Sequence, residues 1–359
     1  MFRVAEYLIQ AQDTSSSGVA ELRALDTRGG GNALSSLWVL SSALARLVRG
    51  RLSGQLAGVH INMAERLSVF RKSAIVLTCR ALGIPVVLHL HAAQLQPFYQ
   101  ALPRPLQGLT RWVFSLPASC VVLGSAAQRF VTEVLQVPAE RVEIIFNGVP
   151  EPTHARRQAG AQPVQRVLFV GNLSERKGVS DFLQALALSG LDRSRLQVTL
   201  AGGGDVAAYQ AKAQQLGLDG LVHFTGWASQ EQVASLMAQS DVLVLPSYDE
   251  GLPLVILEAL ANRVAVVCSP VGEIPTVLQD GVTACFVQPG DVAGIAANLK
   301  RVLQEPALRE ALEHNGRSLY EQQFSLARFS ASVARLHQRH FGKAGQGLQD
   351  SPSAREASP

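Results

Sequence analysis

The chain is poor in cysteine, in aromatic residues and in charge, and its cysteine pattern excludes two kinds of site. Its four cysteines are widely spaced, with no C-x-x-C pair and no Cys/His cluster, so neither a disulfide scaffold nor a thiolate metal site is expected. Only 6% of the residues are aromatic and 17% are charged. No apolar run approaches the roughly 18 residues that cross a membrane. We expect no secretory signal, because Glu6 and Gln10 interrupt the first residues. These features favour a cytoplasmic protein with reduced core thiols.

Apolar residues, in contrast, make up 47% of the 359 residues. This content suits an α/β protein with buried parallel strands, and the length suits two domains of about 150 to 200 residues. Strand-like runs alternate with helical segments along most of the chain. In the first half the predicted strands are Glu21–Asp26, Leu56–Ile61, Pro85–Leu90, Cys120–Leu123 and Val142–Phe146. In the second half they are Arg166–Val170, Gln197–Ala201, Val222–Phe224, Val242–Leu245, Val264–Cys268 and Ala284–Val287.

The alternation is interrupted once, after the turn Asn147–Pro150, by a polar and irregular stretch. We therefore predict two doubly wound domains, over residues 1–150 and 166–342, joined by a linker at 151–165. The final residues, 343–359, are rich in Gly, Ser and Pro and are predicted to be a disordered tail.

The most informative stretch runs from Ser240 to Cys268. It predicts a buried strand, a loop ending in EGLP at 250–253, a helix that carries Glu258, and a second buried strand. The free N–H groups and the dipole at the start of that helix favour an anion. Glu250, just before the helix, could accept hydrogen bonds from a sugar, and Glu258 could reach a ribose diol. A ligand with an anionic group between two hydroxyl-bearing groups is a nucleotide sugar. The alternative interpretation is that Glu250 and Glu258 are solvated glutamates at ordinary helical spacing.

This E-x7-E stretch resembles that of the retaining GT-B glycosyltransferases of family 4, the glycosyl transferases group 1. The resemblance covers most of residues 2–340, and its strongest motifs lie in the second half. It implies two Rossmann-like domains facing a cleft, and transfer of a sugar from a UDP- or GDP-sugar with retention and without metal. It also implies that the donor phosphate, rather than a protein nucleophile, takes the proton of the acceptor.

A second motif is the loop Gly171–Gly178, which follows the first strand of the second half. Lys177 could neutralise a diphosphate at this strand–loop–helix junction and stabilise the charge that develops on the leaving group. The loop resembles the G-R-L-x-x-x-K-G loop of the family, whose Arg and Lys grip the diphosphate. Asn172 stands where that Arg is expected, so either Arg176 supplies the second charge or one cation suffices.

Glycine also follows the next strand, in Ala201–Asp205. Glycine allows close approach of the backbone to a ligand, and we predict that Gly202 lines the nucleotide side of the cleft. The run lacks the G-x-x-G continuation of a dinucleotide-binding motif. The predicted donor-binding residues are therefore Asn172, Arg176, Lys177, Gly202, Gly251, Leu252, Leu254 and Glu258.

In the first half, the strand before His91 carries a second histidine, His89, on the same face. His91 is nearer the carboxyl end and matches the histidine that lies near the transferred sugar in related enzymes. With Lys177 and Glu250 it completes the catalytic candidates. A structural pair and metal ligation are the alternatives. No third ligand and no D-x-D motif are visible, so neither a metal nor another cofactor is expected.

Charge is divided unevenly, with 14 Lys/Arg against 8 Asp/Glu in residues 1–150 and 18 against 20 in the remainder. Several basic residues share one stretch: Arg46, Arg49, Arg51, Arg66, Arg71 and Lys72. A basic N-terminal half suits an anionic acceptor or the anionic lipid of an inner leaflet. The alternative is that these charges are scattered over a solvated surface. Fold analogy suggests a glycan or polyprenyl-linked acceptor in bacterial polysaccharide or lipopolysaccharide synthesis, with the enzyme peripheral on the inner membrane. No nucleic acid partner is expected.

The first residues, Phe2–Gln12, have the apolar spacing of a helix. The family that the chain resembles begins instead with a strand and a Gly-Gly loop. We therefore expect the first strand of the N-terminal domain to be missing, either because Met1 is not the true start or because this N-terminus is a variant. The irregular beginning and Asn172 leave a second hypothesis, a non-catalytic or truncated sugar-nucleotide-binding remnant.

Overall fold

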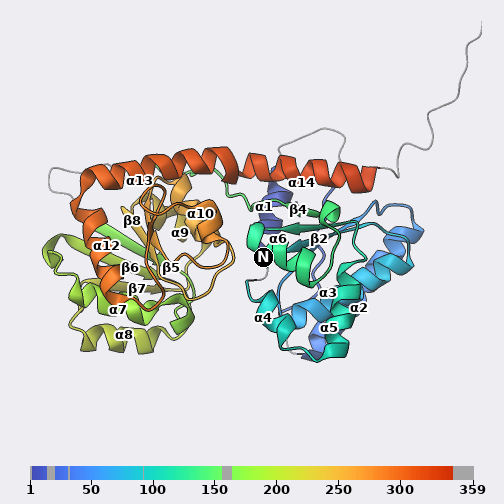
Figure 1. Cartoon of the computed structure of the whole chain (residues 1–359), viewed down its shortest axis with the longest axis horizontal. Helices are drawn as coiled ribbons and strands as arrows, with labels where there is room; N and C mark the ends of the chain where they lie inside the picture. The colour runs from blue at the N-terminus through green and yellow to red at the C-terminus, as the bar shows by residue number, and fades with distance from the viewer. Residues whose placement is uncertain (1, 14–20, 31–32, 92, 156–163, 343–359) are drawn as a thin grey trace, which may run out of the picture.

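The computed structural model describes residues 2–13, 21–30, 33–91, 93–155 and 164–342. Two α/β domains lie side by side, and helices from the end of the chain run across both (Figure 1). One sheet has four strands in the order β1-β2-β3-β4, and the other has six in the order β10-β9-β8-β5-β6-β7. All of their strand pairings are parallel. The predicted α/β class with two Rossmann-like domains is confirmed. The tail predicted at 343–359, and residues 156–163 of the predicted linker, lie outside the described residues.

The strands of the first sheet are β1 (Val59–Met63), β2 (Val86–Leu90), β3 (Ser119–Val122) and β4 (Val142–Ile144). Those of the second are β5 (Gln165–Val170), β6 (Leu196–Ala201), β7 (Val222–Gly226), β8 (Val242–Leu245), β9 (Ala265–Cys268) and β10 (Cys285–Phe286). Every residue of β2, β8 and β9 is buried. Strands covered on both faces read as continuous apolar runs, which is why these three were recognisable in the sequence.

The helices of the first part of the chain are α1 (Phe2–Asp13), α2 (Ala33–Leu52), α3 (Leu67–Ala81), α4 (Leu95–Gln100), α5 (Arg104–Phe114) and α6 (Ser125–Arg129). Those of the second part are α7 (Val179–Leu188), α8 (Val206–Gln215), α9 (Gln230–Ala238), α10 (Leu254–Ala261), α11 (Ile274–Val277), α12 (Val292–Gln304), α13 (Pro306–Leu319) and α14 (Leu326–Phe341). None of the helices among the described residues is long and apolar enough to cross a membrane. The four cysteines are free and buried.

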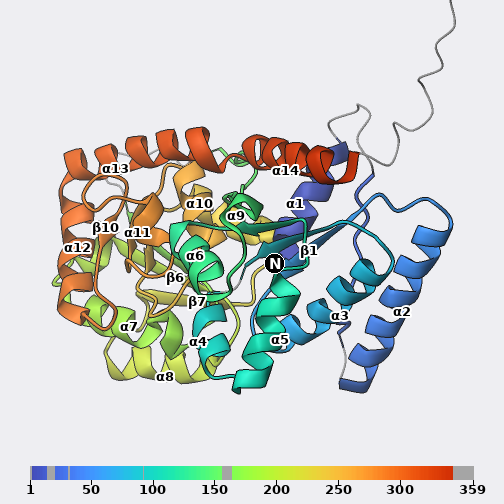
Figure 2. The ribbon, with the colours of Figure 1, turned by 45° about the vertical axis from the view of Figure 1, so that its right-hand side comes forward.

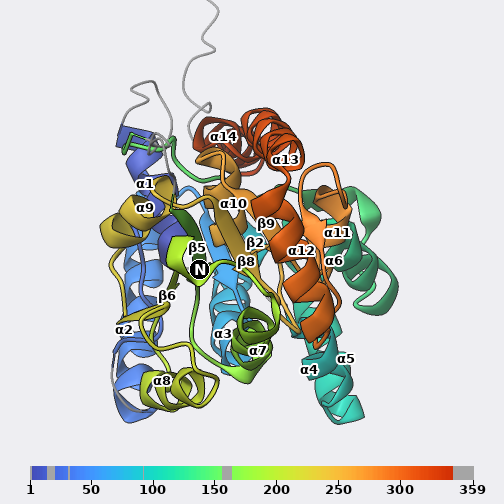
Figure 3. The ribbon, with the colours of Figure 1, turned by 90° about the vertical axis from the view of Figure 1, so that its left-hand side faces the viewer.

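Each sheet is covered by helices on both faces. In the second domain, α7, α8 and α12 pack on one face, and α9 and α10 on the other (Figure 3). In the first domain, Leu88 of β2 belongs to the core beneath α2, α3 and α5. Its neighbour Val87 points to the opposite face, where it packs with α1 and α14. Helix α14 lies within the predicted second domain, 166–342, yet its Phe329 and Val333 pack on the sheet of the first.

One predicted strand is wrong. Residues Glu21–Asp26 form no strand and are largely exposed. Glu21 pairs with Arg23 in solvent, and the Asp26 carboxylate accepts hydrogen bonds from the N–H groups of Arg28 and Gly29. A strand in a doubly wound sheet needs a buried face, and this segment offers none. The expected N-terminal helix is present as α1, and the first described strand along the chain is β1.

Candidate active site

A cavity of about 490 Å³ lies between the two domains. The carboxyl ends of parallel strands from both sheets border it, the place where open α/β sheets bind ligands. From the first domain it is lined by residues that follow β1, β2 and β3, including His91. From the second it is lined by Arg176 and by the segment 249–254, which joins β8 to α10. Five of the predicted site residues therefore line this cavity together with Glu250: His91, Arg176, Gly251, Leu252 and Leu254.

Glu250, which lines this cavity, forms a buried ion pair with Lys177, which is not among the lining residues. The Lys177 ammonium donates to Oε1 of Glu250, and the Ser247 hydroxyl donates to the same oxygen at 2.8 Å. The Lys177 side chain is 13% exposed and that of Glu250 is 8% exposed. Lys177 ends a short 3₁₀ turn, and Gly178 follows in the left-handed region with φ 68°. A side chain on Gly178 would overlap the Pro246 carbonyl. Only glycine therefore allows the loop Gly171–Gly178 to lie against the end of β8.

The other predicted residues of the two glycine loops are Arg176, Asn172 and Gly202. Arg176 donates to the Asp249 carbonyl oxygen at 2.8 Å and so braces the loop that carries Glu250. Asn172 is exposed. Gly202 lies against the Gly171 carbonyl so closely that a Cβ would overlap it. Neither Asn172 nor Gly202 is among the residues that line the cavity.

Glu258 is not among the residues that line the cavity, and its side chain pairs with α1. Its Oε1 accepts a hydrogen bond from Arg3 at 3.0 Å, and the Tyr7 hydroxyl lies 3.5 Å away. Gln230 of α9 donates to that hydroxyl at 2.9 Å. Burial raises the pKa of Glu258, and Arg3 opposes this shift. Burial, followed by the charge of Glu258, raises the pKa of Tyr7 to about 12. The Oε2 atom of Glu258 is buried without a hydrogen-bond partner among the described residues.

His91 is held by a neighbouring strand. Its Nε2 lies 2.8 Å from Oδ1 of Asn62 on β1. Because that oxygen only accepts, Nε2 carries the proton and Nδ1 is left as an acceptor. Burial lowers the pKa of His91 to about 3, so the ring is neutral at physiological pH. It can accept a hydrogen bond from a sugar hydroxyl, but it does not serve as an acid there.

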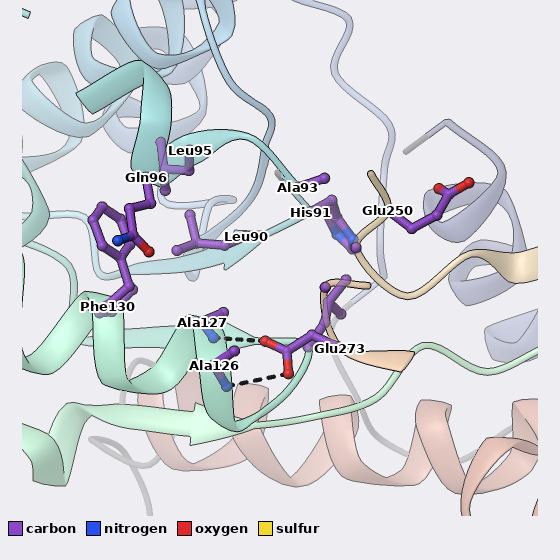
Figure 4. Close-up of a pocket in the computed structure, with 14 residues that line it drawn as sticks. Leu90, His91, Ala93, Leu95, Gln96, Ala126, Ala127, Phe130, Glu250 and Glu273 are labelled. Atoms are coloured by element: carbon purple, nitrogen blue, oxygen red, sulfur yellow. Dashed lines mark hydrogen bonds between the residues drawn. The ribbon is translucent and has the colours of Figure 1, made fainter. Parts of the chain in front are cut away.

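A smaller, largely apolar cavity of about 190 Å³ adjoins the first and also reaches His91 and Glu250. At its edge, the Glu273 carboxylate of the second domain accepts hydrogen bonds from the backbone N–H groups of Ala126 and Ala127 at 3.2 and 2.6 Å. Figure 4 shows this carboxylate reaching across to α6. Sequence reasoning missed this contact. The available signal was the Gly-Glu-Ile-Pro turn after β9, another strand end that faces the cleft. Among the described residues, no three His, Cys, Asp or Glu side chains gather as metal ligands.

Replacement of Lys177 by Met should lower both turnover and stability. The variant leaves Glu250 buried without its cation, which costs about 3 to 5 kcal/mol for a buried pair. The double variant Lys177→Met/Glu250→Gln should regain much of the unfolding free energy, because it buries no unpaired charge, but it should not regain activity. Urea unfolding and kcat measure the two effects. Full activity in Lys177→Met, or no recovery of stability in the double variant, would contradict the assignment.

Comparison with known proteins shows what the chain is similar to. Residues 153–319 match the model of the glycosyl transferases group 1. An uncharacterized glycosyltransferase of Methanocaldococcus jannaschii is 28% identical over 243 residues, 63% of this chain and 62% of that protein. The alpha-D-kanosaminyltransferase of Streptomyces kanamyceticus is 27% identical over 73% of this chain and 72% of its own. The chain thus matches about two thirds of the length of these relatives.

Solved structures resemble the whole arrangement. Sucrose-phosphate synthase from Thermosynechococcus elongatus superposes with a TM-score of 0.74 at 20% identity, covering 95% of this chain and 92% of that one. Anabaena HepE, solved with UDP and glucose, gives 0.70 at 17% identity, over 89% and 86% of the two chains. At these identities the likeness shows the fold alone. The chain thus has the GT-B fold, and its residues 153–319 match the model of the glycosyl transferases group 1.

Proposed function

We propose that this protein is a retaining, metal-independent glycosyltransferase. It transfers a sugar from a UDP- or GDP-sugar to a glycan or lipid-linked acceptor in cell-surface polysaccharide synthesis. The observation that carries the proposal is the Lys177–Glu250 pair just before the start of α10, in which Glu250 lines the cavity between the domains and Lys177 contacts Glu250 without lining it. The UDP complex of a protein with the same fold supports a nucleotide donor. The role in polysaccharide synthesis rests on fold analogy.

In this reaction Lys177 and the first turn of α10 stabilise the leaving diphosphate. The ammonium supplies a full positive charge, and the helix terminus supplies free N–H groups and the positive end of its dipole. Glu250 then exchanges part of its contact with Lys177 for the hydroxyl groups of the donor sugar. His91 accepts a hydrogen bond from that sugar through Nδ1, since Asn62 occupies Nε2. The donor phosphate oxygen takes the proton of the acceptor hydroxyl on the same face of the sugar.

The apolar cavity supports an acceptor that carries an apolar portion. Its wall includes five large apolar side chains and continues to both His91 and Glu250. These side chains are Leu90, Leu95, Leu123, Phe130 and Val131. A polyprenyl-linked acceptor would bury its first apolar units there while its hydroxyl reaches the donor. Burial of apolar area contributes about 25 cal/mol per Å².

A second candidate, a non-catalytic sugar-nucleotide-binding remnant, is favoured by one observation. Glu258, the predicted ribose ligand, is engaged by Arg3 and covered by α1. For the catalytic proposal, the ribose has to displace Arg3 from Glu258 or bind elsewhere in the cleft. The two candidates differ in turnover rather than in binding.

The test combines donor binding with turnover. A screen of UDP-, GDP- and ADP-sugars by thermal shift should reveal one donor, which stabilises the fold by roughly 2.7 kcal/mol at a hundredfold excess over its Kd. Slow hydrolysis of that donor, abolished in Lys177→Met and unchanged by EDTA, would support the enzyme. Binding without hydrolysis would identify the remnant. Activity that EDTA abolishes and Mg²⁺ or Mn²⁺ restores would refute metal independence.

A further inference from the structure

The outer surface of α2, α3 and α5 exposes an unusual share of apolar side chains. Seven of the thirteen large apolar side chains that are exposed in the described part of the chain lie on these three helices. The helices cover one face of the first sheet, and α3 packs between α2 and α5. Figures 1, 2 and 3 all show them on the side of the first domain away from α14. We call this surface the outer helical face. Its exposed apolar residues are Leu37, Trp38, Leu52, Leu67, Phe70, Leu109 and Trp112.

The same three helices carry positive charge only. They contain eight Lys and Arg residues and no Asp or Glu. The bias extends beyond them, because residues 27–132 hold eleven basic side chains and a single acidic one, Glu65. A solvated surface normally mixes both signs. Basic side chains beside exposed tryptophan and leucine are the composition of a helix that lies in a membrane interface.

Helix α5 shows the arrangement most clearly. Its inner side buries Thr110, Val113 and Phe114. Its outer side presents Leu109 and Trp112, which are 45% and 52% exposed. Two further residues of this helix, Arg104 and Arg111, are also exposed. Tryptophan prefers the boundary between lipid headgroups and acyl chains, and arginine binds the phosphates there.

The outer helical face is also linked to the apolar cavity. Leu95 and Gln96 of α4 line that cavity. The same short helix contacts α3 through the ring pair Phe70–Phe98, whose centroids lie 6.2 Å apart. It contacts α5 through Gln107, which donates to the Leu102 carbonyl at 2.9 Å and to that of Gln100 at 3.3 Å. An acceptor anchored in a bilayer beneath α5 would have a short path over α4 to Glu250.

We propose that the outer helical face docks the protein on an anionic lipid bilayer, with Leu109 and Trp112 inserted among the headgroups. A second copy of this chain is disfavoured as the occupant, because two such faces would repel each other. The docking does not depend on donor chemistry, so it stands or falls separately from the proposed reaction. It adds to that reaction a source of acceptor, a lipid that stays in the membrane.

The test is sedimentation of the purified protein with phosphatidylcholine vesicles that contain or lack 40% phosphatidylglycerol. The wild type should bind only the anionic vesicles, and more weakly at high salt. Arg104→Glu/Arg111→Glu should weaken binding at least tenfold, since each basic residue contributes about 1 kcal/mol near such a surface. Leu109→Ser/Trp112→Ser should also weaken it at least tenfold. The changed side chains are exposed, and circular dichroism confirms that each variant is folded.

Matched controls come from the second domain. Arg195→Glu/Lys300→Glu reverses the same number of exposed charges, and Leu188→Ser removes an exposed leucine. Both should bind as the wild type does. Equal binding by all variants, or equal binding to vesicles without phosphatidylglycerol, would overturn the proposal. So would binding to an RNA or heparin probe but not to vesicles, or self-association that explains the pelleting.

Discussion

Acidification below about pH 6.5 is expected to destabilise this protein steeply, because a cluster of neutral histidines is buried in the first domain. His60 is the centre of the cluster. Its Nδ1 lies 2.8 Å from Nε2 of His337 on α14, and its Nε2 lies 3.2 Å from Nδ1 of His89. The His89 and His91 rings lie 4.1 Å apart. The cluster therefore joins the C-terminal helix to the wall of the cavity between the domains.

Burial is the main cause of a lowered pKa at all four rings, and neighbouring histidines add to it. The pKa of His91 falls to about 3 and that of His337 to about 4. Those of His60 and His89 lie well below their usual range. In the unfolded chain each imidazole binds a proton near pH 6.5. Between that pH and about 4 the unfolded state binds more protons than the native state, so stability is full above pH 6.5 and is lost as the pH falls.

Each such histidine should reduce the free energy of unfolding by up to about 1.4 kcal/mol per pH unit below pH 6.5. Urea unfolding at pH 8, 6 and 5 measures the slope. His60→Gln removes one titrating ring. It should reduce the dependence of the unfolding free energy on pH by the contribution of about one proton, whatever its effect on stability at pH 8. His223→Gln, which changes an exposed histidine on β7, should leave the slope unchanged. A stability that is constant from pH 8 to 5 would show that the cluster is protonated or open in the native state.

The strands that sequence reasoning placed best are those buried on both faces. β8 has the predicted bounds, Val242–Leu245, and β9 differs from its prediction by one residue. A run of apolar β-branched residues between turns leaves a parallel strand few alternatives. The prediction at Glu21–Asp26 is wrong because that segment is largely exposed and no neighbouring strand covers it. The local sequence pattern does not show whether another strand lies beside a predicted strand in the folded protein.

The candidate site was predictable as a set of residues but not as a set of contacts. Glu250 and Lys177 were each assigned to a part of the donor, the sugar and the diphosphate, yet the structure pairs them with each other. Glu258 pairs with Arg3, 255 positions away in the chain. The Glu273 carboxylate binds backbone N–H groups of α6 in the other domain. Such a contact cannot be predicted from the sequence, because a backbone donor is present whatever the side chain. Asn62 was missed because only the register of β1 against β2 places it opposite His89 and beside His91.

The second large effect is expected at Gly272, which holds the backbone behind Glu250. Its φ is +60°, a left-handed conformation that L side chains rarely adopt. A Cβ there would overlap the Glu250 carbonyl oxygen and lie 2.9 Å from that of Gly251. The adjoining N–H of Glu273 donates to the Gly251 carbonyl at 3.0 Å. Any side chain at Gly272 therefore displaces the segment that carries Glu250, and with it the Glu273 contact to α6.

Gly272→Ala should lower the free energy of unfolding by about 1 to 2 kcal/mol for the left-handed conformation and by a further 1 to 3 kcal/mol for the overlap. The matched control is Gly281→Ala, because Gly281 has φ +69° and open space around its Cβ position. The control should show only the first loss. Turnover should fall about a hundredfold in Gly272→Ala, since a displacement near 1 Å in a catalytic group costs that much, and should be unchanged in the control. Equal destabilisation of the two variants in urea would show that the Glu250 backbone moves aside at no cost. Such a result would remove the argument that a rigid backbone positions this carboxylate against Lys177.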